Sequence, residues 1–392
     1  MVPLLLAAAL LVFIEASNAA PSPSSSRPCT NLNLAVAVSA NNSIYGVPRV
    51  DNNIDAVDLI WDLERWTAPA LADRITGVHP VDETFTISAQ LCVPRDSDGK
   101  TLQIATHGFG FEKTYWDSEL DPEKYSYVDA ALKAGYSILT YDRLGVGKSD
   151  KPDAYNIVQG PVELEILKEI TLLARSGGLV QFVLNGNGTG MVEIPEFEKI
   201  VLVGHSFGSL LTLSALAEYP DIVEGAVSTG TIYHGRFGEV RQQAFGLEHA
   251  ESNDGRRFRG RGSGYLVQAT ESNVQQIFFK KGFFDPEMLK YGSSIKETGT
   301  VGEFVSLGSV LERPAPAYTG PLLFALGEYD FGVCSGNCTG SYDLEALKSE
   351  TFPAAHNVTV LIQPGSGHAL TMHLNATGHY EAIFAYLREN GL

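Results

Sequence analysis

The chain has 392 residues, of which 44% are hydrophobic and 19% are charged, so it can bury a sizeable core as one large domain with insertions or as two domains. Aspartate and glutamate (46 residues) outnumber lysine and arginine (28 residues), which gives a net charge of −18. A chain this acidic repels phosphate backbones and anionic membranes. Nucleic-acid binding is therefore not expected as its main role.

The first twenty residues predict a secretory signal peptide. Residues 2–14 are apolar throughout but too few to span a bilayer comfortably, and small residues at 17–20 follow them as a cleavage site. An uncleaved anchor is the alternative. No later apolar stretch of the sequence is long enough to span a membrane, so we expect a secreted, extracellular protein without stable membrane insertion.

Cysteines and glycosylation motifs agree with an oxidising compartment. Four cysteines predict two disulfides, with three possible pairings. We favour Cys29–Cys92, which would tie an extended N-terminal arm to a strand, and Cys334–Cys338, which would close a small loop. A metal site at the second pair lacks neighbouring histidine or cysteine ligands. Asn-x-Ser/Thr motifs predict glycosylation at Asn41, Asn187, Asn337, Asn357 and Asn375.

Regular structure is first predicted at residues 82–94. Apolar side chains at Phe85, Ile87, Ala89, Leu91 and Val93 alternate with more polar ones, which predicts a half-buried antiparallel strand near a sheet edge. Further strands are predicted at 102–107, 136–142, 198–204, 223–230, 320–327 and 358–364, and helices at 124–135, 160–176, 207–220, 343–350 and 379–390. This alternation predicts an α/β fold with a mostly parallel sheet, helices on both faces and ligands at the strand C-termini.

Two segments interrupt the alternation. Residues 177–196 are expected to form a surface loop, and residues 233–319, with helical patterns at 238–250 and 273–284, are expected to form an inserted cap over the C-terminal edge of the sheet. The expected domains are a signal peptide (1–20), an N-terminal arm (21–80), a core in two parts (81–232 and 320–392) and the cap (233–319).

The stretch Gly204-His205-Ser206-Phe207-Gly208 stands between a predicted strand and a predicted helix. It can be a plain turn with a polar residue at its tip. It can also be a nucleophile elbow, in which a strained turn presents Ser206 Oγ to a cleft and the two glycines avoid clashes between strand and helix. The motif alone is weakly specific, and its placement between strand and helix favours the elbow.

With these residues the chain resembles the α/β-hydrolases over roughly residues 83–392 less the cap, and most of all the secreted, capped members found in fungi. The resemblance implies a nucleophile, an acid and a histidine in that order. Asp330 follows the strand after the cap and His368 follows the last strand. His368 would accept the proton of Ser206, and Asp330 would orient His368. Glu328 is the alternative acid.

The resemblance also implies an oxyanion hole. One donor would be the backbone N–H of Phe207, at a helix N-terminus. The other would come from the loop His107-Gly108-Phe109-Gly110, which is similar to the family's His-Gly loop. Phe109 N–H is the expected donor and Gly110 N–H the alternative. His107 and His205 are expected to shape the site rather than to perform chemistry.

The stretch "GVGKS" at 145–149 resembles a phosphate-binding loop but has Asp142 where that loop needs glycine, so we interpret it as a structural turn. The expected function is cleavage of a carboxylic ester through an acyl-enzyme on Ser206. A lactonase, thioesterase, C–C hydrolase, peptidase or non-catalytic binding protein on this scaffold is the alternative. No metal or organic cofactor is implied, and the expected partner is a small, partly apolar ester. The cap aromatics Phe278, Phe279, Phe283 and Phe284 either wall a pocket or pack the cap.

Overall fold

The structure is a computed structural model that describes residues 28–183, 193–235, 244–311 and 313–392. The predicted signal peptide, the Asn187 motif and the first part of the helix expected at 238–250 lie outside these residues. The strands of the main sheet are β1 (Cys29–Tyr45), β2 (Ile75–Cys92), β3 (Thr101–Thr106), β4 (Ser137–Tyr141), β5 (Lys199–His205), β6 (Gly225–Thr229), β10 (Leu322–Gly327) and β11 (Val358–Gln363).

These strands form one sheet in the order β1-β2-β4-β3-β5-β6-β10-β11. The pairs from β4 to β11 are parallel, whereas β1 with β2 and β2 with β4 are antiparallel. The expectation of a mostly parallel sheet is therefore confirmed. Because the parallel strands share one direction, the loops that follow β3, β5, β10 and β11 meet at one edge of the sheet.

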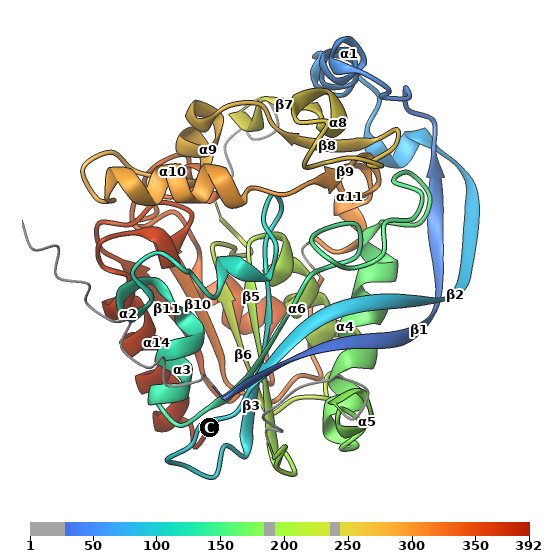
Figure 1. Cartoon of the computed structure of the whole chain (residues 1–392). Coiled ribbons are helices and arrows are strands. Elements are labelled where there is room, and N and C mark those ends of the chain that lie inside the picture. Colours follow the sequence, from blue (N-terminus) through green and yellow to red (C-terminus); the bar gives the residue numbers. More distant parts are fainter. Residues whose placement is uncertain (1–27, 184–192, 236–243, 312) are drawn as a thin grey trace, which may run out of the picture.

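Helices cover both faces of this sheet (Figure 1). The helices of the core are α2 (Pro122–Tyr125), α3 (Tyr127–Lys133), α4 (Gly160–Arg175), α5 (Val180–Val183), α6 (Phe207–Glu218), α12 (Phe331–Cys334), α13 (Leu344–Ala346) and α14 (Ala376–Glu389). Figure 1 shows α3 and α14 together on one side and α4 on the other. Alternate side chains of the central strand β5 point to opposite faces of the sheet. Ile200 and Leu202 belong to the apolar core on one face, and Val201 and Val203 belong to the core on the other.

The N-terminal arm adds β1 and the beginning of β2 to the sheet. β1 pairs with β2 along its whole length, and Cys29 lies opposite Cys92 and forms a disulfide with it, which is the pairing favoured from the sequence. Between these strands, α1 (Asn53–Glu64) is capped by Asn52, whose side chain accepts hydrogen bonds from the N–H groups of Ile54 and Asp55. The strand predicted at 82–94 is thus the end of a longer strand that lies second from the edge, because β1 covers it.

The described residues between β6 and β10 form what we call the cap. It contains a small antiparallel sheet of β7 (Leu247–His249), β8 (Tyr265–Gln268) and β9 (Gly299–Thr300), together with α8 (Ala250–Asn253), α9 (Glu271–Phe278), α10 (Pro286–Ile295) and α11 (Val301–Val305). Figure 1 shows the cap beside α1, at one end of the main sheet.

One element of the cap differs from the expectation. Residues 247–249 were expected to continue a helix, but they form β7 and pair with β8. The physical reason is Gly246, whose φ of +53° lies in the left-handed region and stops a helix. Among the described residues, none of the helices combines the length and apolar character needed to cross a membrane.

Candidate active site

Ser206 lies at the turn between β5 and α6 and has φ 53° and ψ −116°. This left-handed conformation is unfavourable for a residue with a side chain and is typical of a nucleophile elbow. The flanking glycines are sterically required: a Cβ on Gly204 would lie 2.5 Å from Ser209 Cα, and one on Gly208 would lie 2.2 Å from the Thr106 carbonyl oxygen. The turn therefore holds the serine out of the sheet, as the elbow interpretation expects.

His368 and Asp330 lie together after the last two strands. His368 Nδ1 is 2.7 Å from Asp330 Oδ2, and both side chains are buried. The other oxygen of Asp330 accepts a hydrogen bond from Val333 N–H at 2.9 Å. The alternative acid, Glu328, accepts instead from Gly365 N–H at 2.9 Å. The structure thus brings Asp330 and not Glu328 to the histidine.

Ser206 and His368 line the same cavity, which has a volume of about 280 Å³. Its walls are mostly apolar and come from the core and from the cap, with Phe109, Leu210, Phe245, Ile277, Phe304, Leu307, Leu311 and Val333 among them. Phe278, Phe279, Phe283 and Phe284 are not among its lining residues. Phe278 packs instead against Phe111 of the core, with ring centroids 4.8 Å apart. The rings of Phe279 and Phe284 pack on each other at 5.1 Å and Phe283 stacks on Tyr329 at 5.3 Å, so packing is the better interpretation of these aromatics.

The two expected oxyanion donors flank the serine. Phe207 is the first residue of α6, where helix N–H groups are free and the helix dipole favours a negative charge. Gly108 packs so closely on the nucleophile that a Cβ there would lie 2.9 Å from Ser206 Cβ. Within the described part of the chain, the N–H groups of Phe109 and Phe207 have no protein acceptor. Both are therefore available to a bound oxyanion.

Two buried histidines beside the site are neutral. Burial, together with the Arg143 cation, lowers the pKa of His107 to about 3. Burial, together with the nearby His368, lowers the pKa of His205 well below its ordinary value. His205 stacks on Tyr115 with ring centroids 4.3 Å apart, and its Nδ1 lies 3.0 Å from Thr229 Oγ1. These contacts fit the expected shaping roles and leave His368 as the histidine in the cavity.

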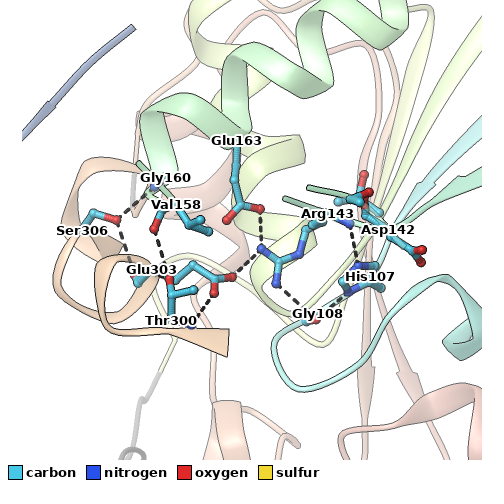
Figure 2. Close-up of polar contacts among 12 residues, drawn as sticks. His107, Gly108, Asp142, Arg143, Val158, Gly160, Glu163, Thr300, Glu303 and Ser306 are labelled. Atoms are coloured by element: carbon cyan, nitrogen blue, oxygen red, sulfur yellow. Dashed lines mark hydrogen bonds and ion pairs between the residues drawn. The ribbon is translucent and has the colours of Figure 1, made fainter. Parts of the chain in front are cut away.

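A buried charge cluster beside the loop His107-Gly108-Phe109-Gly110, the expected oxyanion loop, was not predicted (Figure 2). The guanidinium of Arg143, which follows β4, contacts Glu163 of α4 and lies 2.6 Å from Glu303 of the cap. All three side chains are at most 2% exposed. A sequence signal existed for Glu163, because it shares a helical stripe with the apolar residues Leu167 and Ile170. For Glu303, the partner in the cap, the sequence offered no such signal.

The remaining predicted sites lie on the surface or in a short loop. Cys334 and Cys338 form a disulfide, as favoured from the sequence, and Asn337 is exposed within that loop. Asn41 is exposed on β1, whereas Asn357 and Asn375 are half-buried. Among the residues that the structure describes, no group of three or more histidine, cysteine or acidic side chains is arranged to hold a metal ion.

A model of the alpha/beta hydrolase family matches residues 104–378, which is more than half of the chain. The chain belongs to the alpha/beta hydrolase family. Its fold agrees with solved alpha/beta hydrolases: a monoacylglycerol lipase from Paleococcus ferrophilus (TM-score 0.51, 16% identity, 78% of this chain and 99% of that one) and a carboxylesterase of Nitrososphaera gargenis (TM-score 0.51, 13% identity, 79% and 96%). At these identities the likeness shows the fold.

Among curated proteins, this alpha/beta hydrolase is similar to "Probable lysophospholipase BODYGUARD 1" of Arabidopsis thaliana. The two are 27% identical over 141 residues, which is 36% of this chain and 25% of that protein. The match thus spans about a quarter of the relative's length.

Proposed function

We propose that this alpha/beta hydrolase is a secreted serine hydrolase that cleaves carboxylic esters. Ser206 attacks the ester carbonyl, His368 accepts its proton, and Asp330 orients the imidazole and stabilises its charged form. The oxyanion of the tetrahedral intermediate accepts hydrogen bonds from the N–H groups of Phe109 and Phe207. The alcohol leaves with the proton from His368, and water activated by the same histidine then releases the acid.

The observation that carries this proposal is the shared cavity. A strained serine and a histidine bonded to a buried carboxylate at 2.7 Å open into one apolar space. A plain turn with no catalytic role at Ser206 would need neither the left-handed conformation nor the two glycines. The structural neighbours, a monoacylglycerol lipase and a carboxylesterase, support ester cleavage. The apolar walls favour an ester with an apolar acyl or alcohol group.

Secretion is part of the same proposal. It rests on the apolar N-terminal segment with its small-residue cleavage site, and two disulfides agree with an oxidising compartment. Glycans are proposed on the predicted sequons. Finding a mature chain in culture medium that begins near Ala20 or Pro21 would support secretion, and a chain retained with its apolar segment on membranes would contradict it.

The first experiment is labelling with a fluorophosphonate probe. Wild type and Ser206→Ala are compared, and p-nitrophenyl esters of short and long acids are hydrolysed in parallel. We expect wild type to label and to hydrolyse esters, and Ser206→Ala to do neither. A folded wild type that does not label would refute the proposal and favour a non-catalytic binding protein. Labelling together with faster turnover of lactones, thioesters or peptides would assign one of those bonds instead.

A further inference from the structure

Arg143 holds a carbonyl oxygen of the oxyanion loop. Its Nη2 donates a long hydrogen bond of 3.5 Å to Gly108 O, and its backbone N–H donates to His107 Nε2 at 3.0 Å. Because Nε2 is an acceptor, the neutral His107 carries its proton on Nδ1, which lies 2.8 Å from the same Gly108 O. The arginine thus acts on Gly108 O directly and through the histidine (Figure 2).

The direction of the Phe109 N–H follows from these contacts. Gly108 C=O and Phe109 N–H belong to one peptide unit, which is planar and trans, so the two groups point in opposite directions. Fixing the oxygen on Arg143 and His107 therefore fixes the N–H on the other side of the loop. On that side Gly108 packs directly on Ser206, and the space between them is too small for a Cβ on Gly108.

The cap contacts the same loop at several points. The backbone N–H of Glu297 donates to Gly110 O at 2.8 Å. The Phe109 ring lies on Gly299, where a Cβ would come within 1.8 Å of it, and Phe304 packs on that ring with centroids 4.4 Å apart.

One cap residue links this contact to the arginine. Glu303 contacts Arg143 through Oε1 and accepts from Thr300 N–H through Oε2 at 2.7 Å, so its carboxylate is held at both oxygens. The carboxylate is therefore fixed to the N-terminus of α11 on one side and to the core arginine on the other.

We propose that Arg143 is a positioning residue for the oxyanion hole and that the cap residues 297–304 hold it and the loop in place. The inference rests on the proposed function, because it concerns the same Ser206 site. It makes the cap part of the catalytic geometry as well as a wall of the cavity. A cluster that served folding alone would affect stability and leave the turnover of the folded enzyme unchanged.

The first test is Arg143→Lys, which keeps the charge but cannot present two separate nitrogens to Glu303 and Gly108 O. We expect kcat to fall about tenfold or more, with KM little changed. Affinity for a trifluoromethyl ketone, whose adduct places an oxyanion in the hole, should fall by a similar factor. The matched control is Arg175→Lys, because Arg175 also binds a carboxylate, Glu224, and a carbonyl oxygen, Ile222 O at 2.9 Å.

The second test is Glu303→Gln, compared with Glu287→Gln, which removes an exposed cap carboxylate paired with Lys290. We expect the first change to lower kcat and ketone affinity together, and the second to change neither. Folded variants at Arg143 and Glu303 with wild-type kcat and ketone affinity would overturn the proposal. Unfolding of both would assign the cluster to folding and also count against it. If wild type itself neither labels nor hydrolyses esters, it is the proposed function that fails.

Discussion

At the residue scale, the two acids that follow β10, Glu328 and Asp330, have different partners. Both carboxylates accept backbone N–H groups, but only Asp330 reaches the histidine, at 2.7 Å. Because the two residues are two positions apart just beyond the strand, a change in the direction of the chain decides which one enters the site. The turn at Asp330, which caps α12, makes that choice.

Asp330→Asn is expected to lower kcat about 10⁴-fold, since an amide in place of the carboxylate no longer holds the histidine in the required tautomer. Glu328→Gln should change kcat less than a few-fold. Steady-state hydrolysis of a p-nitrophenyl ester, with thermal unfolding to show that both variants are folded, tests the prediction. Equal losses in the two variants would contradict the assignment of Asp330.

Glu163 predicts a pH dependence of stability. Burial raises its pKa from 4.5 to about 8; the Arg143 cation opposes this shift and the Glu303 carboxylate adds to it. The folded state then binds this proton more tightly than the unfolded state. The resulting contribution of Glu163 to the unfolding free energy is therefore complete below about pH 4.5 and is lost as pH rises through about 8. Wild type should therefore lose more unfolding free energy than Glu163→Gln between about pH 5 and 8 in urea titrations. If the unfolding free energies of the two proteins changed with pH in parallel, the raised pKa of Glu163 would be refuted.

At the scale of elements, the cap helix α9 contributes to the cavity and to the cap interior. Ile277 lines the cavity, whereas Val274, on the same helix, is buried without lining it. Ile277→Ala should lower stability by about 2–4 kcal/mol and shift the preferred p-nitrophenyl ester to a longer acyl chain, because the cavity gains volume. Val274→Ala should lower stability without changing the chain-length profile. Identical profiles in wild type and both variants would mean that the substrate does not occupy this part of the cavity.

Elements were predictable where one periodicity dominates. The strand before Ser206 was predicted from a short apolar run, and the helix after it from apolar residues at helical spacing. The two patterns are separated by the turn that contains the two glycines. No strand was predicted at β1, where an extended arm was expected, although Leu32, Leu34, Val36 and Val38 alternate with exposed residues. β7 was missed because three residues carry too little pattern to reveal a pairing with β8.

At the scale of the whole molecule, the two disulfides close loops of very different length. Cys29–Cys92 spans 63 residues and Cys334–Cys338 spans 4. In the chain-entropy model, alanine pairs at these positions should lower the unfolding free energy by about 4 and about 2 kcal/mol, respectively. Denaturant titrations of the two double variants under non-reducing conditions test this order. A larger loss from the short loop would show that native-state contacts outweigh the loop entropy.

The sequence by itself determined the parallel α/β sheet, the glycine-bounded serine and the chain positions of the acid and the histidine. The sheet depends on local periodicity and the serine turn on the exclusion of side chains, whereas the expected positions of the acid and the histidine follow from the resemblance to the α/β-hydrolases. Only the tertiary structure decided that Asp330 rather than Glu328 meets His368, and that Arg143 lies between Glu163 and Glu303. Those partners are 20 and 160 residues away from the arginine in the chain. The contact with Glu163 depends on how α4 packs on the sheet, and the contact with Glu303 depends on how the cap packs on the core; no local pattern specifies either pairing with Arg143.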